Sequence, residues 1–308
     1  MRPENLKTKI FLDSGDPNET RDIFKLLGFL DGQTTNPTLI SKNPQARARL
    51  QSGQKFLEEE IYDFYKKIIK EISELIPGGS VSIEVYADQS TALAQMFAQS
   101  REMYNWIPNA HIKFPITDIG LQAARQAIAE KMRVNMTLCF SQEQAAAVYA
   151  GTAGAKKGDV FVSPFIGRLD DKGQNGLDLI ANIIKMYESS DGHAQTLSAS
   201  VRNINHFMAC LSLGSDIITA PFEILKEWDE AGLPLPGANF KYDAAGARPI
   251  PYQELDINKD WRGFNVKHEL TDKGIERFAE DWNKLIKINP KSQYPNLKTQ
   301  KVKGRGKR

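Results

Sequence analysis

The 308-residue sequence predicts an α/β fold, a (β/α)8 TIM barrel with a C-terminal helical extension. Eight short strand-like runs occur along the chain, and segments with apolar residues at helical spacing separate them. No hairpin signal joins consecutive runs, so the strands are expected to pair in parallel. The eighth run and its helix end near Gly232, which agrees with the roughly 250 residues that such a barrel needs.

Several helix boundaries can be placed from local signals. Asp118 and Ser141 are positioned as N-caps of predicted helices, and Asp16 before Pro17 repeats the cap-then-proline signal. The interval 36–81 is longer than the others, and we expect an extra short helix there before a long helix at 55–76. Further helices are predicted at 118–131, 142–150 and 176–188. The predicted strands are 10–13, 29–35, 81–87, 111–116, 133–140, 159–166, 195–202 and 216–221.

We expect one domain over residues 1–308, with residues 10–232 as its barrel core. Residues 233–269 are rich in Pro, Gly and polar groups, which predicts an irregular excursion. A helix follows at 272–287, and its apolar stripe requires a surface to cover. We therefore expect the segment 233–297 to dock on the barrel. The stripe consists of Ile275, Phe278, Ala279, Trp282, Leu285 and Ile286.

Composition excludes several classes of protein. The formal net charge of +2 is too small to indicate a nucleic-acid partner. The basic excess is local, at residues 298–308, where we expect a disordered, solvating tail, with an RNA-touching tail as the alternative. The apolar runs are far shorter than a bilayer span, and the N-terminal residues do not resemble a signal peptide. These short apolar runs indicate that the protein has no membrane partner. Cys139 and Cys210 do not make a disulfide framework, so we expect a cytoplasmic protein.

No metal ion is expected from the residues. The four histidines are scattered, and no Cys or His pair has ligand spacing. Residues 151–158 (GTAGAKKG) lack the ending of a Walker A motif, so nucleotide binding is weakly supported.

Polar residues alternate with apolar residues in the predicted strands, which is unusual for a parallel barrel. Strands covered by helices normally read as continuous apolar runs. Here the helices must cover the apolar face, so the polar face is expected to look into the barrel. Buried charges are costly unless paired, and this composition favours a catalytic centre over a structural filler. The converging residues would be Asp13, Glu84, Lys113, Asn135, Thr137, Ser163, Ser200 and Arg202.

Each of these residues also has a purely structural explanation. Taken alone, Lys113 is more simply a buried ion pair with Glu84 or Asp13, and Asp13 could cap the helix near Pro17. Likewise, Asn36 could be the turn residue before Pro37. Arg168 could lie on a solvated loop with Asp170 and Asp171. The functional interpretation is favoured because so many of these side chains fall at strand C-termini, where barrel active sites form.

The chemistry that this set supports begins with the lysine. A confined amine whose charged form is disfavoured can attack a carbonyl and form a Schiff base. The iminium is an electron sink for breaking the adjacent carbon–carbon bond. Asp13 could take a hydroxyl proton, and Glu84 could shuttle protons through water. Asn36 and Asn135 could hold hydroxyl groups, and a phosphate could be held by Arg168, Ser200 and Arg202.

At these residues the sequence resembles the transaldolase family. The resemblance covers residues 10 to about 231 and continues faintly at 267–282 (KHELTDKGIERFAEDW). The threonine-asparagine-proline, lysine and serine-proline-phenylalanine motifs are specific, and their order and spacing match the family. The matching motifs are FLDSGDP around Asp13, DGQTTNPTLI at 31–40, VSIEVYAD at 81–88, IKFPIT at 112–117, VNMTLCFSQEQA at 134–145, VSPFIGRLDD at 162–171 and SASVRN at 198–203.

The resemblance implies a role for each matched residue. Lys113 would form the Schiff base, Asp13 would be the general acid/base and Glu84 would be the partner of the catalytic water. Asn36 and Asn135 would hold a dihydroxyacetone unit with Thr34 and Thr137 close by, Ser163 would contact the substrate, and Arg168, Ser200 and Arg202 would contact its phosphate. The implied reaction moves that unit from fructose 6-phosphate or sedoheptulose 7-phosphate to an aldose phosphate, as in the pentose phosphate pathway. The resemblance also implies that no diffusible cofactor is needed. Longer family members suggest a homodimer.

Two other functions stay open. The related fructose-6-phosphate aldolases release free dihydroxyacetone, but they are shorter and carry a glutamine in place of Glu84 and a tyrosine in place of Phe165. Phe165 therefore leaves the site without a phenol to place water for protonating the enamine. A non-catalytic sugar-phosphate sensor is the third hypothesis. Val201 and residues 233–266 depart from the family pattern, which leaves the acceptor preference open.

Overall fold

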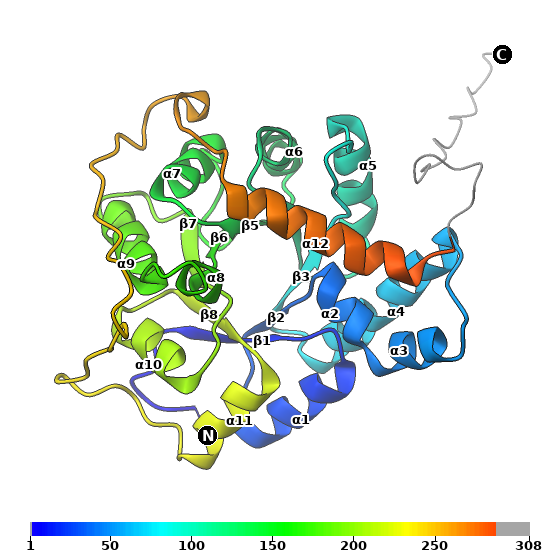
Figure 1. Ribbon diagram of the computed structural model, residues 1–308, viewed down its shortest axis with the longest axis horizontal. Coiled ribbons are helices and arrows are strands. Elements are labelled where there is room, and N and C mark those ends of the chain that lie inside the picture. The colour runs from blue at the N-terminus through cyan, green and yellow to red at the C-terminus, as the bar shows by residue number, and fades with distance from the viewer. Residues whose placement is uncertain (1, 288–308) are drawn as a thin grey trace.

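The structure is a closed barrel of eight parallel strands in chain order, which confirms the predicted TIM barrel (Figure 1). The computed structural model describes residues 2–287. Each strand pairs with its neighbours in sequence, and β1 closes the barrel by pairing with β8. The strands are β1 (Lys9–Asp13), β2 (Gly32–Thr34), β3 (Ser80–Glu84), β4 (Ala110–Pro115), β5 (Val134–Cys139), β6 (Val160–Pro164), β7 (Ala194–Ser198) and β8 (Ile217–Ala220).

Helices surround the barrel, and the last one crosses the opening that faces the viewer in Figure 1. The helices are α1 (Pro17–Leu27), α2 (Pro37–Lys42), α3 (Pro44–Gln51), α4 (Glu58–Leu75), α5 (Leu93–Tyr104), α6 (Asp118–Ala129), α7 (Gln142–Gly151), α8 (Ile166–Asp170), α9 (Gly176–Tyr187), α10 (Ile204–Ser212), α11 (Phe222–Glu230), the short 3-10 helix η1 (Trp261–Gly263) and α12 (Glu269–Leu285). No helix of the described residues is long and apolar enough to cross a membrane.

Two of the three N-cap residues predicted from the sequence cap helices in the structure. Asp16 accepts a hydrogen bond from the Asn18 amide and caps α1, and Ser141 caps α7. The prediction for Asp118 was wrong, because the cap of α6 is Thr117, whose hydroxyl accepts from the Gly120 amide at 3.0 Å. Asp118 is instead the first helical residue, where a carboxylate still interacts favourably with the helix dipole.

Several element bounds differ from the sequence-based ones. Two short helices, α2 and α3, precede α4 where a single one was expected, since Asn43 ends the first and caps the second. The predicted strand 195–202 ends at Ser198, and Ser200 adopts the left-handed conformation with φ 58°. The predicted strand 29–35 begins only at Gly32. Helix α12 starts earlier than predicted because His268 caps it. It also ends earlier, at Leu285, and Ile286 lies beyond its end.

The extension after Gly232 packs on the barrel. Gln142 of α7 exchanges two hydrogen bonds with the backbone of Gln253, and Trp261 of η1 is buried. The apolar stripe of α12 is buried, with Trp282 only 3% exposed, except for Ile286, which is half-buried. This arrangement lays α12 across the barrel mouth. The predicted basic tail at 298–308 lies outside the described residues.

Three aromatic rings fill the barrel one layer below the polar residues. His111 stacks on Phe161 with ring centroids 4.1 Å apart, and Phe11 meets Phe161 edge-on at 6.0 Å. Burial lowers the pKa of His111 to about 3, so its ring is neutral. Its Nε2 lies 2.9 Å from the Gly158 carbonyl, which can only accept, so Nδ1 accepts from the Ser80 hydroxyl. The interior is therefore closed below the site.

Gly32 makes room for this layer, which gives a test of the packing. A Cβ at Gly32 would lie 2.5 Å from the Phe11 ring and 2.5 Å from the Ser80 carbonyl oxygen. Gly32→Ala should therefore lower the free energy of unfolding by about 1–3 kcal/mol through overpacking. A Cβ at Gly78 would meet no atom within 4 Å, so Gly78→Ala should change stability little. Urea unfolding checks both, and equal effects of the two substitutions would contradict this account.

Candidate active site

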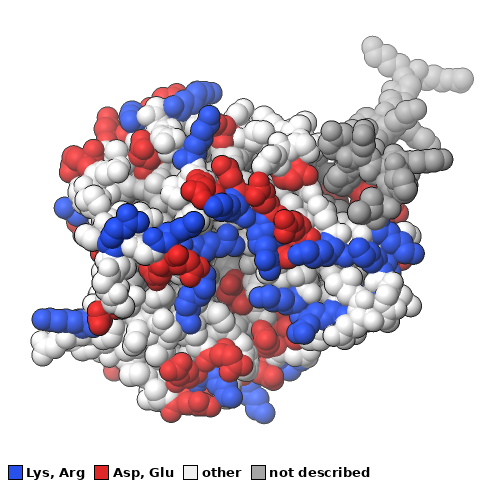
Figure 2. All heavy atoms as spheres, in the orientation of Figure 1, with Lys and Arg blue, Asp and Glu red and all other residues white. Residues whose placement is uncertain are grey.

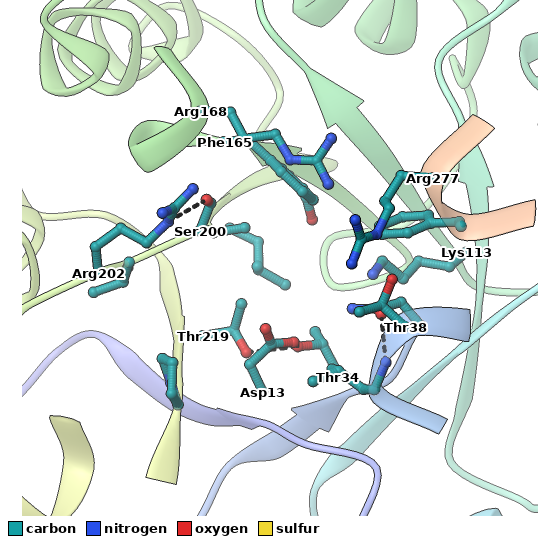
Figure 3. A pocket seen from close by; sticks show the side chains of 18 of the residues that line it. Asp13, Thr34, Thr38, Lys113, Phe165, Arg168, Ser200, Arg202, Thr219 and Arg277 are labelled. Atoms are coloured by element: carbon teal, nitrogen blue, oxygen red, sulfur yellow. Dashed lines mark hydrogen bonds between the residues drawn. The ribbon is translucent and has the colours of Figure 1, made fainter. Parts of the chain in front are cut away.

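A cavity of about 390 Å³ opens at the C-terminal end of the barrel strands. Nine of the twelve residues predicted from the sequence line it (Figure 3). The other three lie behind the lining: Glu84 contacts Lys113, Asn135 contacts Ser163, and Thr137 is fully buried on β5. The nine lining residues are Asp13, Thr34, Asn36, Lys113, Ser163, Phe165, Arg168, Ser200 and Arg202.

Lys113 is a buried lysine at the floor of this cavity. It is 3% exposed, and its Nζ lies 3.0 Å from Glu84 Oε2 and donates to the Thr35 carbonyl at 3.2 Å. The register of β3, β4 and β5 places Glu84, Lys113 and Asn135 side by side. The buried ion pair that sequence reasoning kept as a structural explanation therefore exists, and the same amine also faces the cavity.

Both carboxylates of the site have raised pKa values. Burial raises the pKa of Glu84, and the neighbouring Lys113 opposes that shift. Burial likewise raises the pKa of Asp13, against the opposing effects of Lys113 and of the hydrogen bond from Thr34. A carboxylate with a raised pKa is a stronger base once ionised, which suits a group that must accept a proton.

Hydroxyl groups hold Asp13 in place. Thr34 donates to Asp13 Oδ1 at 2.6 Å, so the 2.6 Å contact between Thr219 and Thr34 must have Thr219 as donor. The cap of α1 is Asp16, so Asp13 does not cap that helix as one structural explanation held. Its carboxylate lines the cavity instead.

Two asparagines present amide groups around the lysine. Asn135 donates to the Ser82 hydroxyl at 3.0 Å and accepts from Ser163 at 2.6 Å. Asn36 caps α2 by accepting from the Leu39 amide at 2.9 Å, and it also lines the cavity. Asn36 is thus both the turn residue before Pro37 and a residue that lines the cavity.

Thr137 has a buried hydroxyl that forms no hydrogen bond with any described residue. It lies two residues after Asn135 on β5, on the same face of the strand. A buried hydroxyl without a partner is costly, so this atom is suited to hold a water molecule.

Arginines form the outer part of the cavity. The guanidinium of Arg168 lies 5.7 Å from the ring centroids of Phe165 and Phe278, and its position on α8 rules out a freely solvated loop. Arg202 donates to Ser200 at 3.4 Å and pairs with Asp171 at 3.0 Å. Figure 2 shows further Lys and Arg side chains around the hollow on this face, with acidic ones between them.

Sequence reasoning missed several lining residues. Arg277 and Phe278 come from α12, and Lys42 and Thr38 come from α2. The one signal available was the position of Arg277 next to the apolar stripe of α12, but the stripe alone did not show which part of the barrel α12 covers. Thr219 on β8 was also missed, although it follows the same strand alternation as Thr34.

Residues 10–288 match the family described as Transaldolase/Fructose-6-phosphate aldolase. The chain belongs to this family. The resemblance drawn from the sequence motifs is thereby confirmed.

Relatives that this chain matches over most of its length are named probable transaldolases. A protein named "Probable transaldolase" from Dehalococcoides mccartyi is 33% identical over 279 residues, covering 91% of this chain and 100% of that protein. One of the same name from Brucella ovis is 36% identical over 276 residues, covering 90% of this chain and 97% of that protein. Among solved structures, 3-hexulose-6-phosphate synthase from Salmonella typhimurium has a TM-score of 0.48 at 15% identity, covering 73% of this chain and 93% of that chain.

The raised pKa of Asp13 gives a prediction about stability. A raised pKa means that the folded state binds this proton more tightly than the unfolded chain, so Asp13 removes stability as the pH rises through the unfolded value of about 3.9 and then the raised folded value. Asparagine does not titrate and can still accept from Thr34. Asp13→Asn should therefore be more stable, relative to the unmodified protein, at pH 7 than at pH 4. Denaturant unfolding at both pH values checks this, and a constant or reversed difference would contradict it.

Proposed function

We propose that this protein is a transaldolase that transfers a dihydroxyacetone unit between sugar phosphates through a Schiff base on Lys113. The donors would be fructose 6-phosphate or sedoheptulose 7-phosphate, and the acceptor an aldose phosphate, as in the non-oxidative pentose phosphate pathway. The observation that carries this proposal is the buried Lys113 amine, 3.0 Å from Glu84 and facing the cavity.

Glu84 is placed to prepare the lysine for attack. Only the neutral amine is a nucleophile, and the raised pKa of Glu84 makes this carboxylate a suitable acceptor of the ammonium proton. The amine would then bond to C2 of the ketose. Loss of the C2 oxygen as water leaves an iminium, and the proton held by Glu84 would be available to that leaving oxygen. The unpartnered hydroxyl of Thr137 is suited to hold the water.

Asp13 would carry out the bond-breaking step. Its carboxylate would accept the proton of the C4 hydroxyl, the C3–C4 electrons would move into the iminium, and the aldose would leave. The enamine left on Lys113 would attack the aldehyde of the acceptor, and Asp13 would return its proton to the new hydroxyl. During this exchange Asn36, Asn135 and Ser163 would hold hydroxyl groups of the bound unit.

The phosphate would lie at the mouth of the cavity. Arg168 and Arg202 offer forked donors, and the Ser200 hydroxyl, 3.4 Å from Arg202 Nε, lines the cavity beside them. Phe165 lines the same wall and has no hydroxyl to hold a water near the enamine. That feature supports transfer to an acceptor over simple release of dihydroxyacetone.

A coupled assay with and without an acceptor tests this proposal. With fructose 6-phosphate alone, we expect little glyceraldehyde 3-phosphate beyond a single turnover, because the enamine waits for an aldehyde. Addition of erythrose 4-phosphate should start continuous release. Free dihydroxyacetone formed without acceptor, at a rate comparable with transfer, would show a lyase. Binding of sugar phosphate without turnover would show a non-catalytic sensor.

A further inference from the structure

Arg277 reaches the cavity from α12, on the side away from Arg202 (Figure 3). Its Nε donates to Asp281 Oδ2 at 2.8 Å, one helical turn further on. Its two terminal nitrogens have no hydrogen-bond acceptor among residues 2–287. The fork of this guanidinium is therefore held at one end and free at the end that faces the cavity.

Asp281 fixes both the side chain and the helix. Its carboxylate, only 7% exposed, accepts from Thr38 of α2 at 2.7 Å and pairs with Lys284 at 3.1 Å, in addition to Arg277. Burial alone would raise the pKa of Asp281, but these three donors lower it below its ordinary value, so the carboxylate stays charged. One buried anion thus ties α12 to α2 and sets the direction of Arg277.

Arg168 lines the same cavity as two other guanidinium groups, those of Arg202 and Arg277. Burial lowers its pKa, and the charges of Arg202 and, more weakly, Arg277 lower it further, while Glu84 opposes them. In the described part of the chain, no carboxylate lies within ion-pair distance of Arg168. Three like charges converging on one cavity repel each other, and a dianion bound among them would relieve that repulsion.

We propose that Arg277 is a third arm of the phosphate site, and that α12 thereby sets the preference for phosphorylated over unphosphorylated acceptors. Asp281 is the positioning residue that aims it. This inference rests on the proposed function for the identity of the substrates. A phosphate monoester is the ligand class that fits, because its three terminal oxygens can accept from three forked donors at once.

Calorimetric titration of the full-length protein with inorganic phosphate tests the site without any turnover. Arg277→Gln should weaken phosphate binding about tenfold, the loss expected for one charge-assisted contact. Lys284→Gln is the matched control, because it removes a positive charge from the same helix and the same carboxylate but does not line the cavity. It should leave phosphate affinity within about twofold. Arg277→Met repeats the test should the glutamine variant misfold.

Two further measurements separate a specificity role from a structural one. The ratio of kcat/KM for erythrose 4-phosphate to that for erythrose should fall about tenfold in Arg277→Gln, mainly through KM. Asp281→Asn, which keeps an acceptor for Thr38, should lower the same ratio by a smaller factor. Phosphate affinity and this ratio both unchanged in the Arg277 variants would overturn the proposal. Absence of transfer by the unmodified protein would overturn the proposed function, while calorimetry would still decide the role of Arg277.

Discussion

The ion pair between Lys113 and Glu84 is the constraint on which the rest of the structure depends. Two opposite charges lie 3.0 Å apart with almost no exposure to solvent. Removing either partner would leave an uncompensated buried charge, which typically costs several kcal/mol. Such a pair is a poor way to gain stability, since well-packed apolar residues often do as well. Its presence is better explained by the proposed function, in which the two groups exchange a proton.

The barrel closes the space below this pair with aromatic rings and surrounds the pair with polar side chains on the cavity side. The ring layer of Phe11, His111 and Phe161 closes the interior one step beneath the lysine, and the neutral His111 adds no charge there. Beside the pair, Asn135 accepts a hydrogen bond from Ser163, and the Lys113 amine faces the cavity. Helix α12 then covers part of the mouth and brings a cation with it. Charge is thus arranged in layers, with the Lys113–Glu84 pair deepest and the arginines of the proposed phosphate site outermost.

Much of the fold and of the candidate site could be predicted from the sequence because the alternation of polar and apolar residues in a strand is a local property. In a parallel barrel, period-two alternation and a shared C-terminal edge bring Asp13, Lys113 and Ser163 together without knowledge of side-chain contacts. Arg277 could not be found in this way. Its place depends on how α12 crosses the mouth, which Asp281 and Thr38 fix through a contact between residues far apart in the chain. The left-handed Ser200 and the cap at Thr117 are likewise set by local geometry that pattern reading does not resolve.

Borohydride reduction in the presence of fructose 6-phosphate, followed by proteolysis and mass spectrometry, tests the central claim most directly. Reduction converts a Schiff base into a stable amine, so the substrate-derived group that stays attached identifies the lysine that formed the Schiff base. The account predicts the adduct on the peptide that contains Lys113 and no adduct in Lys113→Ala. An adduct on another lysine, or continued transfer by Lys113→Ala, would contradict it.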